Sequence, residues 1–254
     1  MFGLEMWQIL AAIIIAVFSG FVKGAIGFAM PMIMLSALGS VMSATTAIAC
    51  LIMPTLVTNI FQAFRQGPQE AVASLKLVRW HVVMVVIFMC VSAPFARILP
   101  QPIMYILLGV PIVIYSLWQL SGRPLALHVR HQRKAEIVTG IIGGLYGGVS
   151  GIWGPPLIVY LMTAHVGKTD QVRIQGIVFL IGAVVMVIVH SFTGLLNANT
   201  LALSLILVVP SCLGLFLGFA LQDRLDVVQF RRWTQILLVV TGLNLIRRAI
   251  EIGF

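Results

Sequence analysis

The amino-acid sequence predicts an all-α polytopic membrane protein made of two inverted five-segment repeats, each with a glycine-broken first helix pair. Three observations support this fold class: the composition, a series of apolar runs, and a glycine-proline pattern that occurs twice. Of the 254 residues, 60% are hydrophobic and only 9% are charged, whereas soluble domains carry about 25% charged residues. A soluble core of this size has no room for so much apolar surface, so we expect lipid to surround the chain.

Ten apolar runs divide the chain, and a membrane-spanning helix needs about 20 apolar residues. The runs of the first half are 4–22, 24–39, 44–64, 79–99 and 102–120. Those of the second half are 135–147, 149–165, 172–196, 200–221 and 231–250. The first two runs of each half are short or meet at glycines, which disfavour helix by about 1 kcal/mol each. Each such pair is either two short spans or a hairpin that enters and leaves on one side.

The glycine-proline pattern reads Gly-x3-Gly-x2-Gly-x3-Pro, and its two copies lie 124 positions apart. The first copy extends from Gly20 to Pro31 and the second from Gly144 to Pro155. One interpretation is close helix packing, because small residues let two backbones approach. The other is an interrupted helix whose freed N–H groups bind an anion. A glycine-broken segment at matching positions of both halves is the sequence feature that best indicates a transport site.

The basic residues indicate how the segments are oriented. With the N-terminus outside, thirteen basic residues fall on the inside and three on the outside. The inside set is Lys23, Arg65, Lys76, Arg79, Arg123, Arg130, Arg133, Lys134, Lys168, Arg173, Arg224, Arg231 and Arg232, and the outside set is Arg97, Arg247 and Arg248. This asymmetry follows the positive-inside rule and predicts a multi-pass protein of the cell inner membrane with both termini outside. Because each half has an odd number of segments, the second half enters from the opposite face, as inverted repeats do.

The longest polar stretch of the chain joins the two halves. It covers residues 121–134 and separates a first membrane repeat, 1–120, from a second, 135–254. We expect this linker on the cytoplasmic side and no soluble domain. The same loop charges account for the net charge of +9, so we expect no nucleic-acid partner. The N-terminus has no basic region before its apolar run, which predicts that this run stays as a membrane helix.

The glycine patterns supply the first candidate substrate-binding residues. Lys23 is either a marker of an inside loop or a cation that faces the substrate, and its counterpart in the second copy is Gly147. Ser150 either donates to an anion or bonds its own helix backbone. Together with these two side chains, the expected set includes the pattern glycines Gly20, Gly24, Gly27, Gly148 and Gly151.

The third run of each half adds further polar candidates. Asn59 and Gln62 are three residues apart and therefore share one helix face. Polar groups inside a membrane are costly and usually face a cavity, although hydrogen bonds between helices are the alternative. Arg173 is either a charge at the end of a loop or a substrate contact. The expected set from these runs is Thr45, Asn59, Gln62, Arg173 and Gln175.

Several classes of function are disfavoured by the residues that the apolar runs lack. No carboxylate lies deep in a run, so a cation pump is disfavoured and an anion or neutral substrate fits better. The three cysteines lie singly, so we expect no metal site and no cofactor. Gly148-Val-Ser150-Gly151 resembles the GxSG of rhomboid intramembrane proteases, which would need a histidine such as His190 as base. The first copy repeats the glycines without the serine, so we expect a transporter and not an enzyme.

The residues described above resemble the TauE/SafE sulfite exporter family, also called the TSUP group. The resemblance covers nearly the whole chain and rests on Gly20 to Pro31, Thr45 to Gln62, Gly144 to Pro156 and Gln171 to Gln175. It implies export of sulfur-containing oxyanions or small organic anions such as sulfite, sulfoacetate and related sulfonates. Ala29 departs from the pattern, since glycine is expected after Gly27-Phe28, and this leaves the geometry of the first break open.

The residues and the resemblance together predict a secondary transporter that exports a small sulfur-containing anion by alternating access. In this mechanism one half rocks against the other around a site near the midplane. The alternative is an importer of a small carboxylate or neutral metabolite, and an intramembrane serine protease is a distant second. The expected partners are a small anionic substrate and the lipid bilayer. Direction, proton coupling and whether the protein forms a homodimer stay open at this stage.

Overall fold

The computed structural model describes residues 4–65, 67–122, 131–164, 166–221, 224 and 226–253, and the regular elements in these ranges are all helices. They are α1 (Met6–Ile26), α2 (Met30–Gly39), α3 (Ala44–Ala63), α4 (Pro68–Leu77), α5 (Arg79–Ser92), α6 (Phe95–Ile98), α7 (Gln101–Leu120), α8 (Gln132–Ser150), α9 (Gly154–Thr163), α10 (Lys168–Phe192), α11 (Ala198–Ile206), α12 (Val208–Leu221) and α13 (Val227–Gly253). Most of the expected linker, 123–130, lies outside the described residues.

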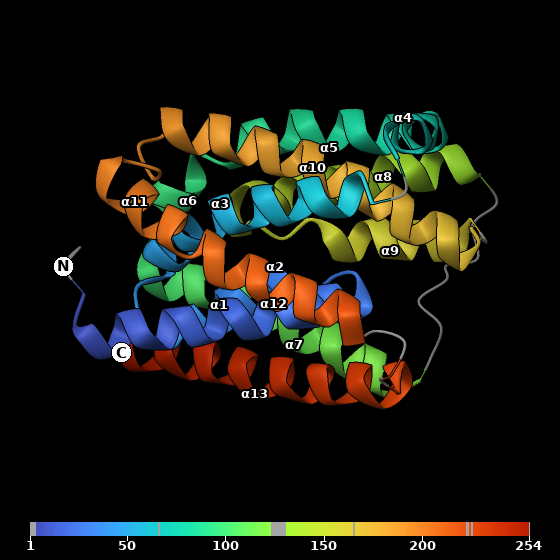
Figure 1. The fold of residues 1–254 in the computed structure, drawn as a ribbon. Helices are drawn as coiled ribbons and strands as arrows, with labels where there is room; N and C mark the ends of the chain where they lie inside the picture. Colours follow the sequence, from blue (N-terminus) through green and yellow to red (C-terminus); the bar gives the residue numbers. More distant parts are fainter. Residues whose placement is uncertain are drawn as a thin grey trace.

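The long helices lie roughly along one common direction and form a bundle (Figure 1). The N- and C-termini lie at one end of the bundle, which we call the terminal end. The end of α7 and the start of α8 lie at the opposite end, which we call the linker end. Within the described residues, six helical stretches are long and apolar enough to cross a membrane, and α2 and α9 are shorter apolar helices of ten residues each. The predicted all-α polytopic membrane fold is confirmed.

The chain breaks later in each glycine pattern than the apolar runs suggest. We expected the first boundary near Lys23, but α1 continues through it and ends at Ile26. In the second half α8 likewise continues through Ser150 and α9 begins at Gly154. Glycines inside each pattern remain helical because the neighbouring helix approaches them closely, so tertiary contacts offset their weak helix propensity. Lys23 is therefore part of a helix and not of a loop.

Glycines of α1 form a close contact with α12. A Cβ atom added at Gly20 would lie 2.1 Å from the carbonyl oxygen of Ser211, and one at Gly24 would lie 2.2 Å from that of Leu215. The glycines of α12 reciprocate, because a Cβ at Gly214 would lie 2.0 Å from the carbonyl oxygen of Val17. No residue with a side chain fits these positions without separating the helices.

Glycines of α8 form the matching contact with α5. A Cβ added at Gly144 would lie 2.8 Å from the carbonyl oxygen of Val85, and one at Gly148 would lie 2.2 Å from the hydroxyl oxygen of Ser92. The first helix of each half thus packs on the fourth segment of the other half. The remaining close pairs, α3 with α10 and α7 with α13, also join corresponding segments of the two halves. An inverted repeat predicts this reciprocal pattern, and the repeat itself stays a prediction.

Candidate functional site

Both glycine patterns end in a short non-helical break with unusual backbone geometry. In the first break Gly27 has φ +85° and Ala29 has φ +76°, and in the second Gly151 has φ +74°. Each break is followed by a proline in the first turn of the next helix, Pro31 in α2 and Pro155 in α9. Proline suits that position because its missing N–H is one that the first turn leaves unpaired anyway. Left-handed residues therefore end α1 and α8, and the prolines mark where α2 and α9 start.

The two breaks meet at one cavity with a volume of about 400 Å³, in which the open space at its mouth is included. Its walls come from α1, α3, α10 and both breaks, and the lining residues are Lys23, Phe28, Ala29, Pro31, Met32, Thr55, Asn59, Gly151, Ile152, Trp153, Gly154, Pro155 and Phe179. The N-termini of α2 and α9 both lie at this cavity. A helix N-terminus carries a partial positive charge of about half a unit and several free N–H groups. The cavity is therefore suited to an anion.

Lys23 contributes a buried amino group to the cavity, which carries a positive charge when it is protonated. Its side chain is 2% exposed, and the ammonium group donates hydrogen bonds to Thr58 Oγ1 at 2.9 Å and to Asn59 Oδ1. Thr58 donates its own hydroxyl hydrogen to the carbonyl oxygen of Pro54, so its oxygen is free to accept from the lysine. Within the described part of the chain no ion pair includes Lys23. A buried charge without a counter-charge is costly, and a bound anion would balance it.

The two amides predicted on one face of the third run hold the first break and α10 in place. Asn59 donates to the carbonyl oxygen of Phe179 at 2.9 Å, which ties α3 to α10. Gln62 donates to the carbonyl oxygen of Gly27 at 2.8 Å, which ties α3 to the break. Asn59 lines the cavity and Gln62 does not. Asn59 thus joins Lys23 at the site, and Gln62 supports the backbone beside it.

Two buried polar atoms in the cavity wall have no hydrogen-bond partner among the described residues: Thr55 Oγ1 and Trp153 Nε1. Buried polar atoms are normally paired, so the unpaired Thr55 hydroxyl in the cavity wall is available to hydrogen-bond a ligand. Thr55 and Thr58 were not among the substrate-binding residues expected from the sequence. Thr55 is four residues before Asn59 and Thr58 is four residues before Gln62. This spacing places each pair on one face of α3 and could have identified them.

Of the remaining glycine-pattern candidates, Gly151 lines the cavity and the others lie outside its lining. Gly20, Gly24 and Gly148 are in the helix contacts described above. Ser150 donates to the carbonyl oxygen of Tyr146 at 2.6 Å and accepts from the backbone N–H of Ile152 at 3.0 Å. This serine bonds its own helix and stabilises the turn into the break, the second of the two roles considered for it. Gly27 ends α1 at the cavity's edge, and Gly151 lies in its wall.

The other candidates from the third runs are also outside the cavity lining. Thr45 is in the first turn of α3, within 3.2 Å of the hydroxyl of Ser43. Arg173 pairs with Asp170 one turn earlier in α10, at 2.5 Å. Gln175 is a buried residue of α10 near the linker end, because its neighbour Gly176 contacts Ala63 at the end of α3. The structure does not bring these three side chains to the cavity, and their role in binding stays a prediction.

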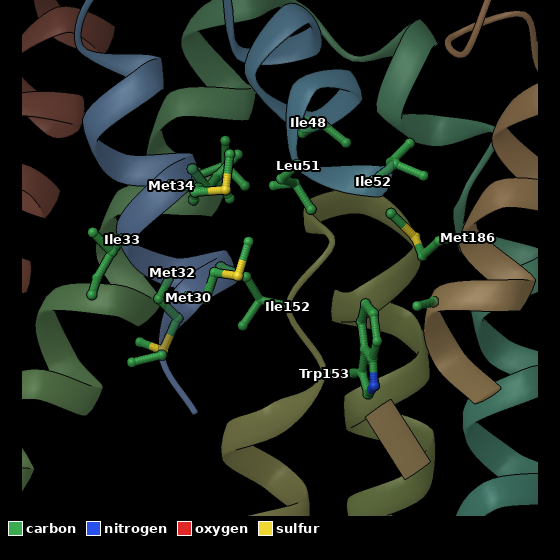
Figure 2. Close-up of a cluster of buried hydrophobic side chains, with 14 of the residues drawn as sticks. Met30, Met32, Ile33, Met34, Ile48, Leu51, Ile52, Ile152, Trp153 and Met186 are labelled. Carbon is green, nitrogen blue, oxygen red and sulfur yellow. The ribbon is translucent and has the colours of Figure 1, made fainter. Parts of the chain in front are cut away.

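A cluster of buried apolar side chains lies on the terminal side of the cavity. Figure 2 shows methionines of α2 facing Ile152 and Trp153 of the second break, with α3 residues above them and Met186 of α10 beside them. The α3 residues are Ile48, Leu51 and Ile52, which precede the cavity residue Thr55 along the helix. We call this cluster the apolar plug; its labelled residues are Met30, Met32, Ile33, Met34, Ile48, Leu51, Ile52, Ile152, Trp153 and Met186. Met32, Ile152 and Trp153 of the plug also line the cavity, so the plug forms part of its wall.

Comparison with known proteins identifies the family. No curated protein and no solved structure matches the chain. The family model described as sulfite exporter TauE/SafE matches residues 12–245, nearly the whole chain. The match includes both glycine patterns, Lys23 and every residue that lines the cavity. This protein therefore belongs to the TauE/SafE sulfite exporter family of membrane transporters.

Proposed function

We propose that this protein is a secondary transporter that exports a small sulfur-containing anion, such as sulfite, sulfoacetate or a related organosulfonate, by alternating access. The observation that carries the proposal is the cavity where two helix N-termini meet a buried lysine without a carboxylate partner. Family membership supports the substrate class, because the matching family is described as sulfite exporters.

The chemistry of the cavity favours an oxyanion over a cation or a neutral solute. The ammonium group of Lys23 uses two of its three N–H bonds on Thr58 and Asn59, which leaves one for a ligand. The hydroxyl of Thr55 offers a second donor. Backbone N–H groups in the first turns of α2 and α9 offer more. Sulfite and sulfonate groups carry three acceptor oxygens, which suits donors that converge from several sides.

The orientation proposed here puts the linker end in the cytoplasm and both termini outside the inner membrane. The inside loops hold most of the basic residues, as the positive-inside rule requires. With this orientation the membrane potential favours export, because moving one charge through 100 mV is worth about 2.3 kcal/mol. The apolar plug then closes the outer side of the cavity, and rocking of one half against the other would open it.

Two other functions have weaker support. An importer of a small carboxylate or neutral metabolite would use the same cavity, with another substrate and the opposite direction of transport. The protease alternative needs a hydrogen bond between Ser150 and His190. His190 Nε2 instead lies 3.0 Å from the carbonyl oxygen of Gly148, and Ser150 donates to Tyr146. Both side chains therefore bond to backbone carbonyl oxygens and not to each other, which does not support a protease.

The test is transport by the purified protein in liposomes of defined orientation. We expect sulfite efflux that is accelerated by an imposed potential, negative on the linker side, and competition by sulfoacetate stronger than by acetate. Lys23→Met should abolish this efflux. Lys76→Met, at an exposed lysine of α4, is the matched control and should leave it unchanged. Equal rates for Lys23→Met and the unmodified protein, or transport of acetate but not of sulfur oxyanions, would overturn the proposal.

A further inference from the structure

A cation lies at the linker side of the cavity, outside its lining. The guanidinium carbon of Arg231, near the start of α13, is 5.4 Å from the centre of the Phe28 ring. Phe28 is 6% exposed and forms part of the cavity wall, whereas Arg231 is exposed. The aromatic ring therefore contacts an accessible cation and also lines the cavity that contains Lys23.

The backbone around Phe28 has the geometry of a hinge. Gly27 and Ala29, on either side of it, both have left-handed φ values, and Ala29 is the only non-glycine residue with positive φ in the described part of the chain. That conformation costs a residue with a Cβ about 1–2 kcal/mol, and such strain gathers at gates and switches. The segment is held through the bond from Gln62 to Gly27. The backbone beside the ring has open space, since a Cβ at Gly27 would have no neighbour within 4 Å.

A second polar side chain follows Arg231 on the same face of α13. Gln235 is 1% exposed, and neither amide atom has a hydrogen-bond partner among the described residues. Residues four apart lie on one face of a helix, so Gln235 is the next polar group inward from Arg231. Because a buried amide without a partner is costly, this amide is available to hydrogen-bond a ligand.

The packing of α13 places these two residues beside the start of α2. Thr241 donates to the hydroxyl of Ser36 at 2.9 Å, and Arg248 donates to the carbonyl oxygen of Gly39. The later residue of α2 contacts the later residue of α13, so the two helices run in the same direction. Tracing back from these contacts brings Gln235 to the level of the N-terminus of α2. The unpaired amide therefore lies near the helix end that faces the cavity.

We propose that Arg231 and Gln235 form a linker-side binding site for the oxyanion substrate, and that Phe28 is the gate between this site and the cavity. The proposal rests on the function proposed above and adds the path by which the anion arrives. A guanidinium group binds sulfonate or carboxylate oxygens through two parallel N–H bonds. An exposed cation at the mouth of a cleft raises the local anion concentration and the rate of access. Swinging of Phe28 on its two left-handed neighbours then passes the anion to Lys23.

The experiment measures access to the cavity and needs no transport. In protein with Cys50, Cys90 and Cys212 replaced by serine or alanine, Thr55→Cys puts one reactive thiol in the cavity wall. Two methanethiosulfonate reagents, one with a sulfonate group and one with a trimethylammonium group, are added from the linker side. We expect Arg231→Gln to slow the anionic reagent about tenfold relative to the cationic one. The matched control is Arg232→Gln, at the adjacent exposed arginine, and should leave the ratio within about twofold. The Arg231 effect should shrink at 1 M salt, where exposed charges are screened.

The remaining variants test the gate and keep the proposal falsifiable. Phe28→Ala should accelerate both reagents, and Phe28→Leu, which keeps much of the bulk, should accelerate them less. Gln235→Leu should weaken sulfite uptake into the cavity without slowing the cationic reagent. Equal reagent ratios for Arg231→Gln and Arg232→Gln would overturn the proposal, as would labelling that is unaffected in both Phe28 variants. The unmodified protein could move no sulfite while Arg231→Gln still lowers the labelling rate of the anionic reagent relative to the cationic one. In that case the function proposed above fails and the linker-side anion site stands.

Discussion

The two glycine breaks have the same backbone design but different side chains. Each follows a helix that packs through glycines on the other half, and each ends in a left-handed residue before a proline-started helix. At the first break Lys23 points its charge at the cavity and bonds to Thr58 and Asn59. At the second break Ser150 bonds its own helix, and Trp153 packs edge-on against Phe179. The first break therefore supplies charge and the second supplies shape, although both direct a helix N-terminus at the same cavity.

Each glycine pattern also has two parts with separate roles. The early glycines of both patterns, such as Gly24 and Gly148, let helix backbones touch. The last glycines, Gly27 and Gly151, turn the chain. Packing and interruption were two competing explanations at the level of sequence, and each accounts for different positions. Substitutions that separate these roles are the strongest tests.

The largest expected effect is on folding. Gly24→Ala puts a Cβ 2.2 Å from the carbonyl oxygen of Leu215 and should destabilise the protein by about 3 kcal/mol or more, as overpacking does. Gly27→Ala meets no atom within 4 Å and is strained only by its φ of +85°, at a cost of about 1–2 kcal/mol. Thermal unfolding in detergent measures both. A Gly27 variant less stable than the Gly24 variant would contradict the division of roles.

The next effect separates the charged break from the uncharged one. Among the described residues, Lys23 is the only basic residue of the cavity lining. Lys23→Met should weaken sulfite binding about 30-fold, because a hydrogen bond to a charged group is worth about 1.5–3 kcal/mol. Lys23→Arg keeps the charge but not the fit to Thr58 and Asn59, and should recover only part of the affinity. Calorimetric titration with sulfite gives the values. Full affinity in Lys23→Met would show that the helix N-termini suffice.

A smaller loss should follow from Thr55→Val. This change removes a hydroxyl that has no partner among the described residues and keeps the side-chain volume. We expect sulfite affinity to fall about 5- to 10-fold, the value of one net hydrogen bond, with stability unchanged or raised. The same titration measures it, with unfolding as the control. If stability fell and affinity did not, Thr55 would be a structural residue.

Ala29→Gly should relieve strain at the first break. Glycine avoids the Cβ clash of the left-handed conformation but is more flexible when unfolded, so the net gain should be about 0.5–1 kcal/mol. The measurement is the free energy of unfolding in detergent. Ala37→Gly, inside the regular helix α2, is the matched control and should destabilise by about 1 kcal/mol. The same sign for both variants would argue against strain at Ala29.

The smallest effect on function should come from Ser150→Ala. The hydroxyl bonds Tyr146 and Ile152 of its own segment, so its loss should cost about 1 kcal/mol of stability and change sulfite affinity by less than about threefold. A larger drop in affinity, with stability intact, would return Ser150 to the substrate site and make the two breaks more alike than their contacts suggest.

Much of the fold could be predicted from the amino-acid sequence. Composition and the apolar runs predicted the all-α membrane fold, because a chain this apolar has few other stable states. The repeated glycine-proline pattern predicted two interrupted helices. Lys23 and Asn59, both expected at the binding site, are hydrogen-bonded to each other in the structure, and their role in binding stays a prediction. The break positions were less predictable, since helix propensity alone ends α1 at its glycines and tertiary packing carries it on to Ile26.

The tertiary structure alone decided which polar groups meet. Thr55 comes to the cavity because α3 turns that face toward the two breaks. Arg173 does not, because its own helix offers Asp170 as a partner. Arg231 reaches Phe28 across more than two hundred residues of sequence. The sequence by itself determined the solvent, the segments and the two helix interruptions, since these depend on local hydrophobicity and backbone preference. Which charge faces which helix end was decided by packing between distant segments, which no local pattern encodes.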